Sequence, residues 1–321
     1  MSRRVVVPID LGCCPADAPA RCALCAPAPE MPDPELVDAY VYAARRDMAD
    51  DAEKDELVVS FLGGPLPAAP LLDALDGARF TARVRPDLFT RTDLARLVDA
   101  GASGIEVDAL TFDDHALRRC GRMYGGKRID EILAGVKAAG LEAGIVLAPG
   151  LPGTDPDTLR ADAHRADADI ARIHPVLVRS GSTLERWFTE GMYRPLSVDD
   201  AVELCREMAD TLEARGIRVV RIGIQPHEAE GAVIAGPVHS SLREVVETSR
   251  ILTRLRVALD GTPPGAYIEV RCARSDEART RGPENRNVAV LRIEFGLAEV
   301  RVVADDGLAR GELTVVERGR A

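Results

Sequence analysis

Short apolar runs rich in β-branched residues alternate with helix-like segments along most of this 321-residue chain, and this alternation restricts the fold more than any other feature. The run Leu57–Leu62, for example, has the length and composition of a buried strand and ends at a Gly-Gly-Pro turn. Because parallel strands need long crossover connections, strands that alternate with helices predict a parallel α/β sheet. The predicted strands begin at Val5 and span 57–62, 80–85, 104–107, 142–147, 170–178 and 219–225, and the predicted helices begin at Pro34 and after Pro156 and span 92–100, 128–139 and 197–215.

Strands and helices in this order can form either an open doubly wound sheet or a barrel. Several distinctive residues favour the barrel, because that fold carries its chemistry on loops at the C-terminal ends of the strands. The sequence therefore predicts an α/β fold built on a partial (β/α)6 TIM-like barrel. The residues that fall at or just past predicted strand ends are Cys14, Gly63, Gly64, Arg85, Glu106 and Gly150.

The pattern changes after residue 236, where one long helix is followed by short strands separated by turn residues. We therefore predict two domains, a barrel core over 1–236 and a small α+β C-terminal domain over 237–321. In the second domain the expected helix spans 242–259, and the expected strands span 267–272, 287–294, 300–303 and 312–316.

The overall charge and the cysteine content limit the class of protein. The formal net charge of -11 argues against nonspecific binding to polyanions, although a local basic groove is compatible with it. The first twenty residues lack the apolar segment of a signal peptide, and no stretch approaches the roughly 18 apolar residues of a membrane span. We therefore expect a cytoplasmic protein whose seven cysteines are reduced thiols available to a metal.

Four of those cysteines lie close together in the loop after the first predicted strand, at Cys13, Cys14, Cys22 and Cys25. Thiolates that share one metal centre must lie near one another, so a cysteine-rich loop predicts a metal site. Three thiolates can hold a four-iron cluster and leave one iron open to a further ligand, whereas four thiolates close the site. On the residues alone, a 4Fe-4S cluster and a four-cysteine zinc site both remain open.

Two longer motifs indicate a family. Residues Ala148–Asp155 and Ala171–Leu184 resemble conserved segments of the radical S-adenosylmethionine (SAM) enzymes, in the branch containing the catalytic subunit of Elongator and its short relatives. The resemblance covers about residues 5–226, and the segment 236–239 resembles the short relatives. No glycine-rich acetyl-CoA loop follows Gly236, so we expect a short form without the acetyltransferase domain. The resemblance continues at Phe61–Pro65, Arg85–Asp87, Trp187, Gly191, Tyr193 and Pro195.

The resemblance implies a cofactor set and a reaction. The implied cofactors are a 4Fe-4S cluster and SAM, whose reductive cleavage yields methionine and a deoxyadenosyl radical that abstracts hydrogen from a substrate. It also implies an electron donor such as flavodoxin or ferredoxin as a partner. The implied ligands are Cys14, Cys22 and Cys25 for the cluster, with Cys13 as the alternative to Cys14, Gly63 and Gly64 for the methionine amino group, Glu106 for the ribose, Arg122 for the carboxylate, and Gly150 for the adenine.

Each of these positions also has an ordinary structural explanation. The glycines fit common strand-to-helix turns, Arg122 fits a solvated helix arginine, and Glu106 fits a barrel-interior carboxylate paired with an arginine such as Arg85. The chain also departs from the family pattern. Leu24 replaces the aromatic residue before the last cysteine, Leu110 replaces a glutamine, and Tyr124 replaces a histidine.

The sequence leaves the substrate open between a small molecule and RNA. Arg172, His174 and Arg221 lie on late strands and are candidates for substrate contact. We expect a radical SAM enzyme, and the alternative is a zinc-stabilised, non-catalytic binding or scaffold protein on a degenerate barrel. A basic mouth for an anionic substrate would draw on Arg83, Arg85, Arg172, Arg179 and Arg221.

Overall fold

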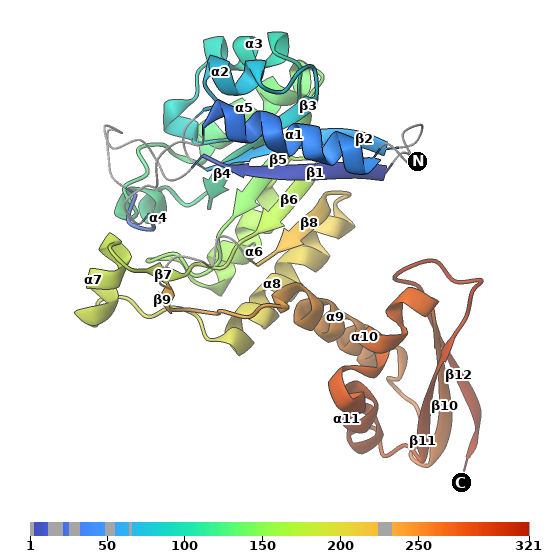
Figure 1. The fold of residues 1–321 in the computed structure, drawn as a ribbon. Coiled ribbons are helices and arrows are strands. Elements are labelled where there is room, and N and C mark those ends of the chain that lie inside the picture. The colour runs from blue at the N-terminus through green and yellow to red at the C-terminus, as the bar shows by residue number, and fades with distance from the viewer. Residues whose placement is uncertain are drawn as a thin grey trace. The chain divides into compact units, whose positions relative to one another are not determined.

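A computed structural model gives the fold as two compact units, Met1–Ser240 and Ser241–Ala321, each of which is described by itself (Figure 1). No helix in the described part of the chain is both long and apolar enough to cross a membrane. The structure describes residues 3–11, 22–25, 33–48, 55–63, 66–223 and 233–320.

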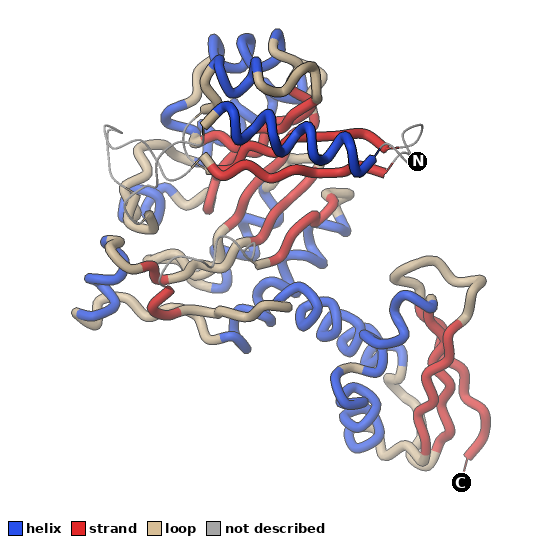
Figure 2. The backbone as a smooth tube through the Cα atoms, in the orientation of Figure 1, coloured by secondary structure: helices blue, strands red, loops and turns tan. Residues whose placement is uncertain are grey.

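The first unit is built on a curled, seven-stranded parallel sheet, with its strands drawn in red in Figure 2. The prediction of a partial TIM-like barrel is confirmed, because the strands follow one another in chain order and leave β1 and β8 as the two edges. In spatial order the strands are β1 (Arg3–Asp10), β2 (Asp55–Leu62), β3 (Arg79–Val84), β4 (Ala102–Leu110), β5 (Glu142–Leu147), β6 (Ile170–Ile173) and β8 (Arg218–Ile222).

The central strands are largely buried on both faces, because helices cover one face and the other lines the barrel interior. In β4 all residues but Asp108 are buried, and in β5 all but Glu142. The helices α1, α5 and α8 pack against neighbouring strands. The helices of this unit are α1 (Pro34–Met48), α2 (Ala69–Asp73), α3 (Arg91–Asp99), α4 (Asp114–Arg119), α5 (Gly126–Ala138), α6 (Pro156–Arg165), α7 (Thr183–Thr189) and α8 (Val198–Ala214), with a 3-10 turn at Pro86–Leu88.

Capping residues in the sequence determine where several helices begin. Thr90 and Asp93 form a capping box at the start of α3, and the Asp155 carboxylate accepts a hydrogen bond from the Thr158 amide of α6. The predicted sixth strand was too long, because the strand ends at Ile173. The chain then leaves the sheet, and β7 (Val178–Arg179) pairs antiparallel with β9 (Val233–Ala235).

The second unit places helices against a three-stranded sheet of order β11-β10-β12. The predicted strand over 287–294 is wrong, because Arg286–Glu294 is the helix α11. Val288, Leu291 and Phe295 recur at helical spacing and pack into the apolar core of this unit. The elements are α9 (Leu242–Ala258), β10 (Ala266–Cys272), α10 (Glu277–Arg281), α11 (Arg286–Glu294), β11 (Glu299–Ala304) and β12 (Leu313–Arg320), with 3-10 turns at Arg274–Asp276 and Pro283–Asn285.

Candidate functional site

The C-terminal edge of the parallel sheet brings most of the predicted site residues to one end of the first unit. Gly63 directly follows β2, Glu106 lies within β4, Arg122 follows α4, and Gly150 follows β5. Cys22 and Cys25 lie in a short described segment between β1 and α1. The predicted ligands Cys13, Cys14 and Gly64 lie outside the described residues.

Main-chain hydrogen bonds hold the segment Cys22–Cys25 between two later parts of the chain. The Ala23 amide donates to the Cys120 carbonyl over 2.9 Å, at the end of α4, and the Leu184 amide of α7 donates to the Ala23 carbonyl over 2.9 Å. The Cys25 amide donates to the Cys22 carbonyl over 3.3 Å, which makes a tight turn. Both cysteines of the Cys-x-x-Cys motif are therefore fixed by backbone geometry.

Cys22 has the electrostatic surroundings of a metal-binding thiolate. Its side chain is buried, at 1% exposure, and a hydrogen bond from Cys25 together with the nearby Arg122 charge lowers its pKa to about 5, against the opposing effect of burial. The thiolate is the form that binds metals, so this residue fits a cluster ligand. Within the described residues no group of three or more metal-binding side chains occurs, because two of the four candidate cysteines lie outside them.

Arg122 is a buried residue and not the solvated helix arginine that its sequence context also allowed. It follows the end of α4, is 3% exposed, and its Nη2 lies 2.9 Å from Asp108 Oδ2. A buried guanidinium beside the Cys22 thiol favours anions at this end of the barrel. The implied contact with a cofactor carboxylate remains a prediction.

Glu106 forms a bidentate ion pair with Arg172 across the intervening strand β5. Arg172 Nε lies 2.6 Å from Glu106 Oε2, and Arg172 Nη2 lies 2.8 Å from Glu106 Oε1. Arg83 Nη2 approaches the same carboxylate at 3.7 Å. The prediction that Arg85 is the partner of Glu106 is wrong, because the Arg85 guanidinium makes a bidentate pair with Asp87.

Gly144 makes this pair possible, and sequence reasoning missed it. Gly144 lies directly opposite Glu106 in the β4–β5 register, and a Cβ atom there would lie 2.8 Å from Glu106 Cγ. The Glu106 side chain therefore passes over a strand position that has no side chain of its own. A glycine inside an otherwise apolar strand was the available signal, since such glycines often mark close approaches.

The glycine turns at the strand ends adopt backbone conformations that favour glycine. Gly63 has φ +113° and Gly150 has φ +93°. At Gly150 a Cβ atom would also lie 3.0 Å from the Leu196 side chain, and the Tyr193 hydroxyl donates to the Gly150 carbonyl over 2.7 Å. These contacts explain the glycines structurally, and their roles toward methionine and adenine remain predictions.

Two of the three departures from the family pattern meet at the end of β4, where Leu110 ends the strand and the Tyr124 side chain reaches it from between α4 and α5. Leu110 has φ +64°, an uncommon conformation for a leucine, and the buried Tyr124 hydroxyl donates to the Asp108 carbonyl over 2.9 Å. Burial raises the pKa of Tyr124, so it is a neutral donor. Both residues therefore shape the backbone at the carboxyl end of this strand.

A cavity of about 130 Å³ connects the cysteine segment with the late strands. Its lining includes Leu24 from between the two cysteines, Asp108 from β4, and His174 and Arg179 from beyond β6. Burial and the charges of Arg83, Arg172 and Arg221 hold the pKa of His174 well below its usual value. A larger groove of about 660 Å³ lies between α3 and α5 and contains none of the predicted site residues.

Comparison with known proteins supports the same fold and family. A family model described as the Radical_SAM C-terminal domain matches residues 168–251. A curated tRNA uridine(34) acetyltransferase of Dehalococcoides mccartyi is 27% identical over 117 residues, which cover 35% of this chain and 26% of that protein. One from Methanocaldococcus jannaschii is 25% identical over 168 residues, or 50% of this chain and 30% of that protein. The chain thus spans less than a third of the length of either curated relative.

A solved structure has the same fold. The archaeal Elp3 of Methanocaldococcus infernus, with an N-terminal deletion, aligns with a TM-score of 0.62 and 17% sequence identity. The alignment covers 80% of this chain and 64% of that one. Because identity is low, this similarity is evidence for the fold alone.

Proposed function

We propose that this chain cleaves SAM reductively at a 4Fe-4S cluster. The proposal rests on the resemblance to the Elongator-like branch of the radical SAM enzymes, which the family match, the curated relatives and the fold support. The observation that carries the proposal is the geometry of Cys22 and Cys25. They form a Cys-x-x-Cys turn, with Cys22 buried beside the Arg122 guanidinium and Cys25 half-buried, at the C-terminal end of a parallel half-barrel.

The residues present fit this cofactor pair. Cys22 and Cys25, with Cys14 or Cys13, would hold three irons of the cluster. When bound, the cluster and SAM supply one electron and a carbon-centred radical for hydrogen abstraction from a substrate. The cofactor would be bound by Gly63 and Gly64 through the backbone, by Arg122 at the carboxylate, by Glu106 at the ribose and by Gly150 at the adenine.

The Glu106–Arg172 pair is compatible with a role for Glu106 in ribose binding. A carboxylate offers about four acceptor positions, and Arg172 uses two of them. The remaining positions can accept hydrogen bonds from paired ribose hydroxyls. Arg172 would then fix the orientation of the carboxylate that receives the ribose.

The proposed substrate is RNA or a small molecule. The curated relatives bear names that assign them to tRNA modification, which makes RNA a candidate substrate beside small molecules. Acetyl transfer is not part of the proposal, because this chain aligns with less than a third of each relative.

Anaerobic reconstitution with iron and sulfide tests the proposal. We expect four irons and four acid-labile sulfides per chain, a change in the Mössbauer spectrum on addition of SAM, and release of deoxyadenosine under a strong reductant. A colourless protein that retains one zinc ion would instead establish the zinc-stabilised scaffold. Cys205→Ala is a matched control, because Cys205 is a buried thiol of α8 outside the cysteine segment.

A further inference from the structure

The groove of about 660 Å³ between α3 and α5 has room for another helix. Both of its helices pack against β4, and all of its lining lies within 89–99 and 128–139, inside one continuous described stretch of the chain. Small residues at Ala95 of α3 and at Ala134, Gly135 and Ala138 of α5 keep the groove open. Because these positions carry little side-chain volume, a third helix can approach at the interaxial distance of about 8–10 Å that is usual in helix packing.

The α3 wall of the groove carries apolar side chains that are only partly covered. Val98 is 37% exposed, Leu94 is half-buried, and Ala95 is exposed. Residues three and four apart lie on the same side of a helix, so these positions form one face together with both ends of α3. Covering this face would remove apolar surface from water.

The four charged residues of the groove lining sum to zero, and two of them already form a pair. Arg128 Nη1 lies 3.4 Å from Glu131 Oε2 on α5. The other two, Arg91 and Asp99, are the exposed first and last residues of α3, and neither forms an ion pair with another described residue. The α3 face therefore has a positive end, an apolar middle and a negative end.

We propose that this groove binds α3 of a second copy of the chain, in an antiparallel dimer with two-fold symmetry. Ala95 stands four residues from Arg91 and four residues from Asp99. A two-fold axis beside Ala95 therefore brings Arg91 of each copy to Asp99 of the other, and the small Ala95 side chain permits close approach of the two helices. In such an interface each contact occurs twice.

Charge complementarity favours a second copy over other occupants of the groove. An apolar segment would cover Leu94 and Val98, but it would leave Arg91 and Asp99 without a counter-charge. A parallel arrangement of two α3 helices would bring like charges together, which is unfavourable. The antiparallel arrangement satisfies both charges with residues that the chain itself supplies.

Sedimentation equilibrium of the full chain, from low micromolar to several hundred micromolar concentration, tests the proposal. We expect the mean mass to rise from one chain toward two. Arg91→Glu and Asp99→Arg should each raise the dimer dissociation constant about tenfold, because each replaces two attractive contacts by two repulsive ones. The double variant should recover most of the wild-type affinity, because the two ends of α3 are then complementary again.

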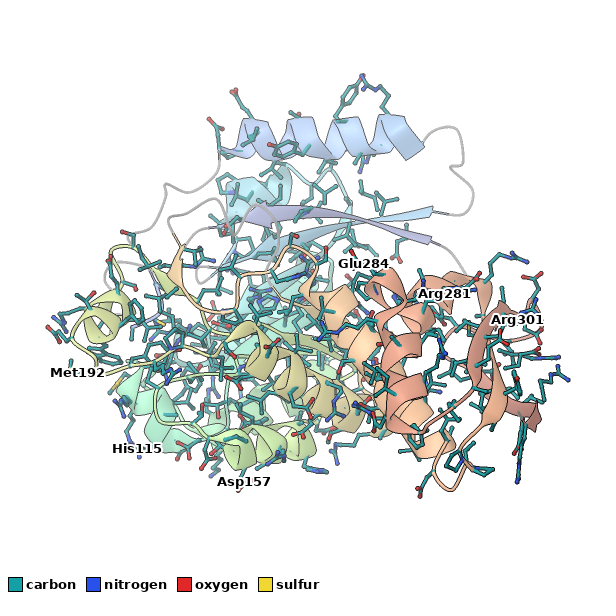
Figure 3. The ribbon with its side chains drawn as sticks, turned by 90° about the horizontal axis from the view of Figure 1, so that it is seen from below. His115, Asp157, Met192, Arg281, Glu284 and Arg301 are labelled. Carbon is teal, nitrogen blue, oxygen red and sulfur yellow. The ribbon has the colours of Figure 1, made fainter. Side chains whose placement is uncertain are left out.

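Two further variants separate this interface from general charge effects. Ala95→Glu brings two carboxylates together at the symmetry axis and should abolish the dimer. Arg301→Glu reverses an exposed arginine of β11 in the second unit, labelled in Figure 3, and should leave the dissociation constant unchanged. Circular dichroism of each variant checks that the fold is retained, which is expected because the replaced side chains are exposed.

A chain that stays monomeric over the whole concentration range overturns the proposal. A dimer that Arg91→Glu and Ala95→Glu leave unchanged also overturns it, because the contact then lies elsewhere. If both single charge reversals weaken the dimer and the double variant does not restore it, the antiparallel pairing is wrong. The measurement requires neither cluster nor SAM, so its result is independent of the SAM-cleavage proposal.

Discussion

Glu106 and Arg172 are joined by two hydrogen bonds of 2.6 and 2.8 Å although they belong to strands that are not neighbours. The pair crosses β5 above Gly144, and the Glu106 side chain is only 4% exposed. The barrel interior therefore contains a buried charge pair whose geometry depends on a residue without a side chain.

Gly144→Ala should destabilise the first unit. The new methyl group would lie 2.8 Å from Glu106 Cγ and 3.2 Å from Ile170 Cγ1, so strand or side chain must shift. Overpacking of this kind costs about 1–3 kcal/mol in the free energy of unfolding, measurable by urea denaturation. Gly135→Ala in α5 is the control and should be neutral or stabilising, because its Cβ would meet Leu94 at an ordinary 3.7 Å.

Replacing one residue of the Glu106–Arg172 pair should lower the free energy of unfolding more than replacing both. Arg172→Gln leaves a buried carboxylate whose remaining ion-pair partner among the described residues is the more distant Arg83, and loss of one partner of a buried pair costs about 3–5 kcal/mol. A double-mutant cycle with Glu106→Gln, followed by urea denaturation, measures the coupling. Purely additive effects would show that the two side chains do not interact in solution.

Cys22→Ala should abolish cluster binding and SAM cleavage while leaving the fold nearly intact. The segment is held through the main chain of Ala23, which the substitution preserves. Iron content and deoxyadenosine release are measured beside circular dichroism, with Cys205→Ala as the reference. Deoxyadenosine release by Cys22→Ala would refute the ligand assignment. Of Cys13→Ala and Cys14→Ala, only one should lose the cluster.

Asp162→Asn should stabilise the protein more at pH 7.5 than at pH 4. Burial raises the pKa of Asp162 to about 6, so ionisation opposes folding. The protonated Asp162 carboxyl therefore contributes to the free energy of unfolding below the unfolded-state pKa of about 4. This contribution is lost as the pH rises through the folded-state pKa of about 6. Asparagine keeps an acceptor for the Phe112 amide, which donates to Asp162 over 2.8 Å. Equal unfolding free-energy differences at both pH values would contradict the shift.

The regular part of the fold was predictable because strand and helix periodicities are local. The parallel strands and most helices follow from such patterns, but Arg286–Glu294 was misassigned because alternating β-branched residues also fit a helix with one apolar face. The Glu106–Arg172 pair could not be predicted, because it depends on strand register between residues 66 positions apart. The predicted roles of Cys13, Cys14 and Gly64 remain predictions, since these residues lie outside the described parts.

The two backbone hydrogen bonds of Ala23 also bear on how the protein is assembled. Their partners, Cys120 and Leu184, are synthesised long after the cysteine segment leaves the ribosome. The segment near the N-terminus therefore gains its anchors only when the second half of the barrel is present. Loading of the proposed metal site would therefore come at a late stage of biogenesis, after the nascent chain has passed α7.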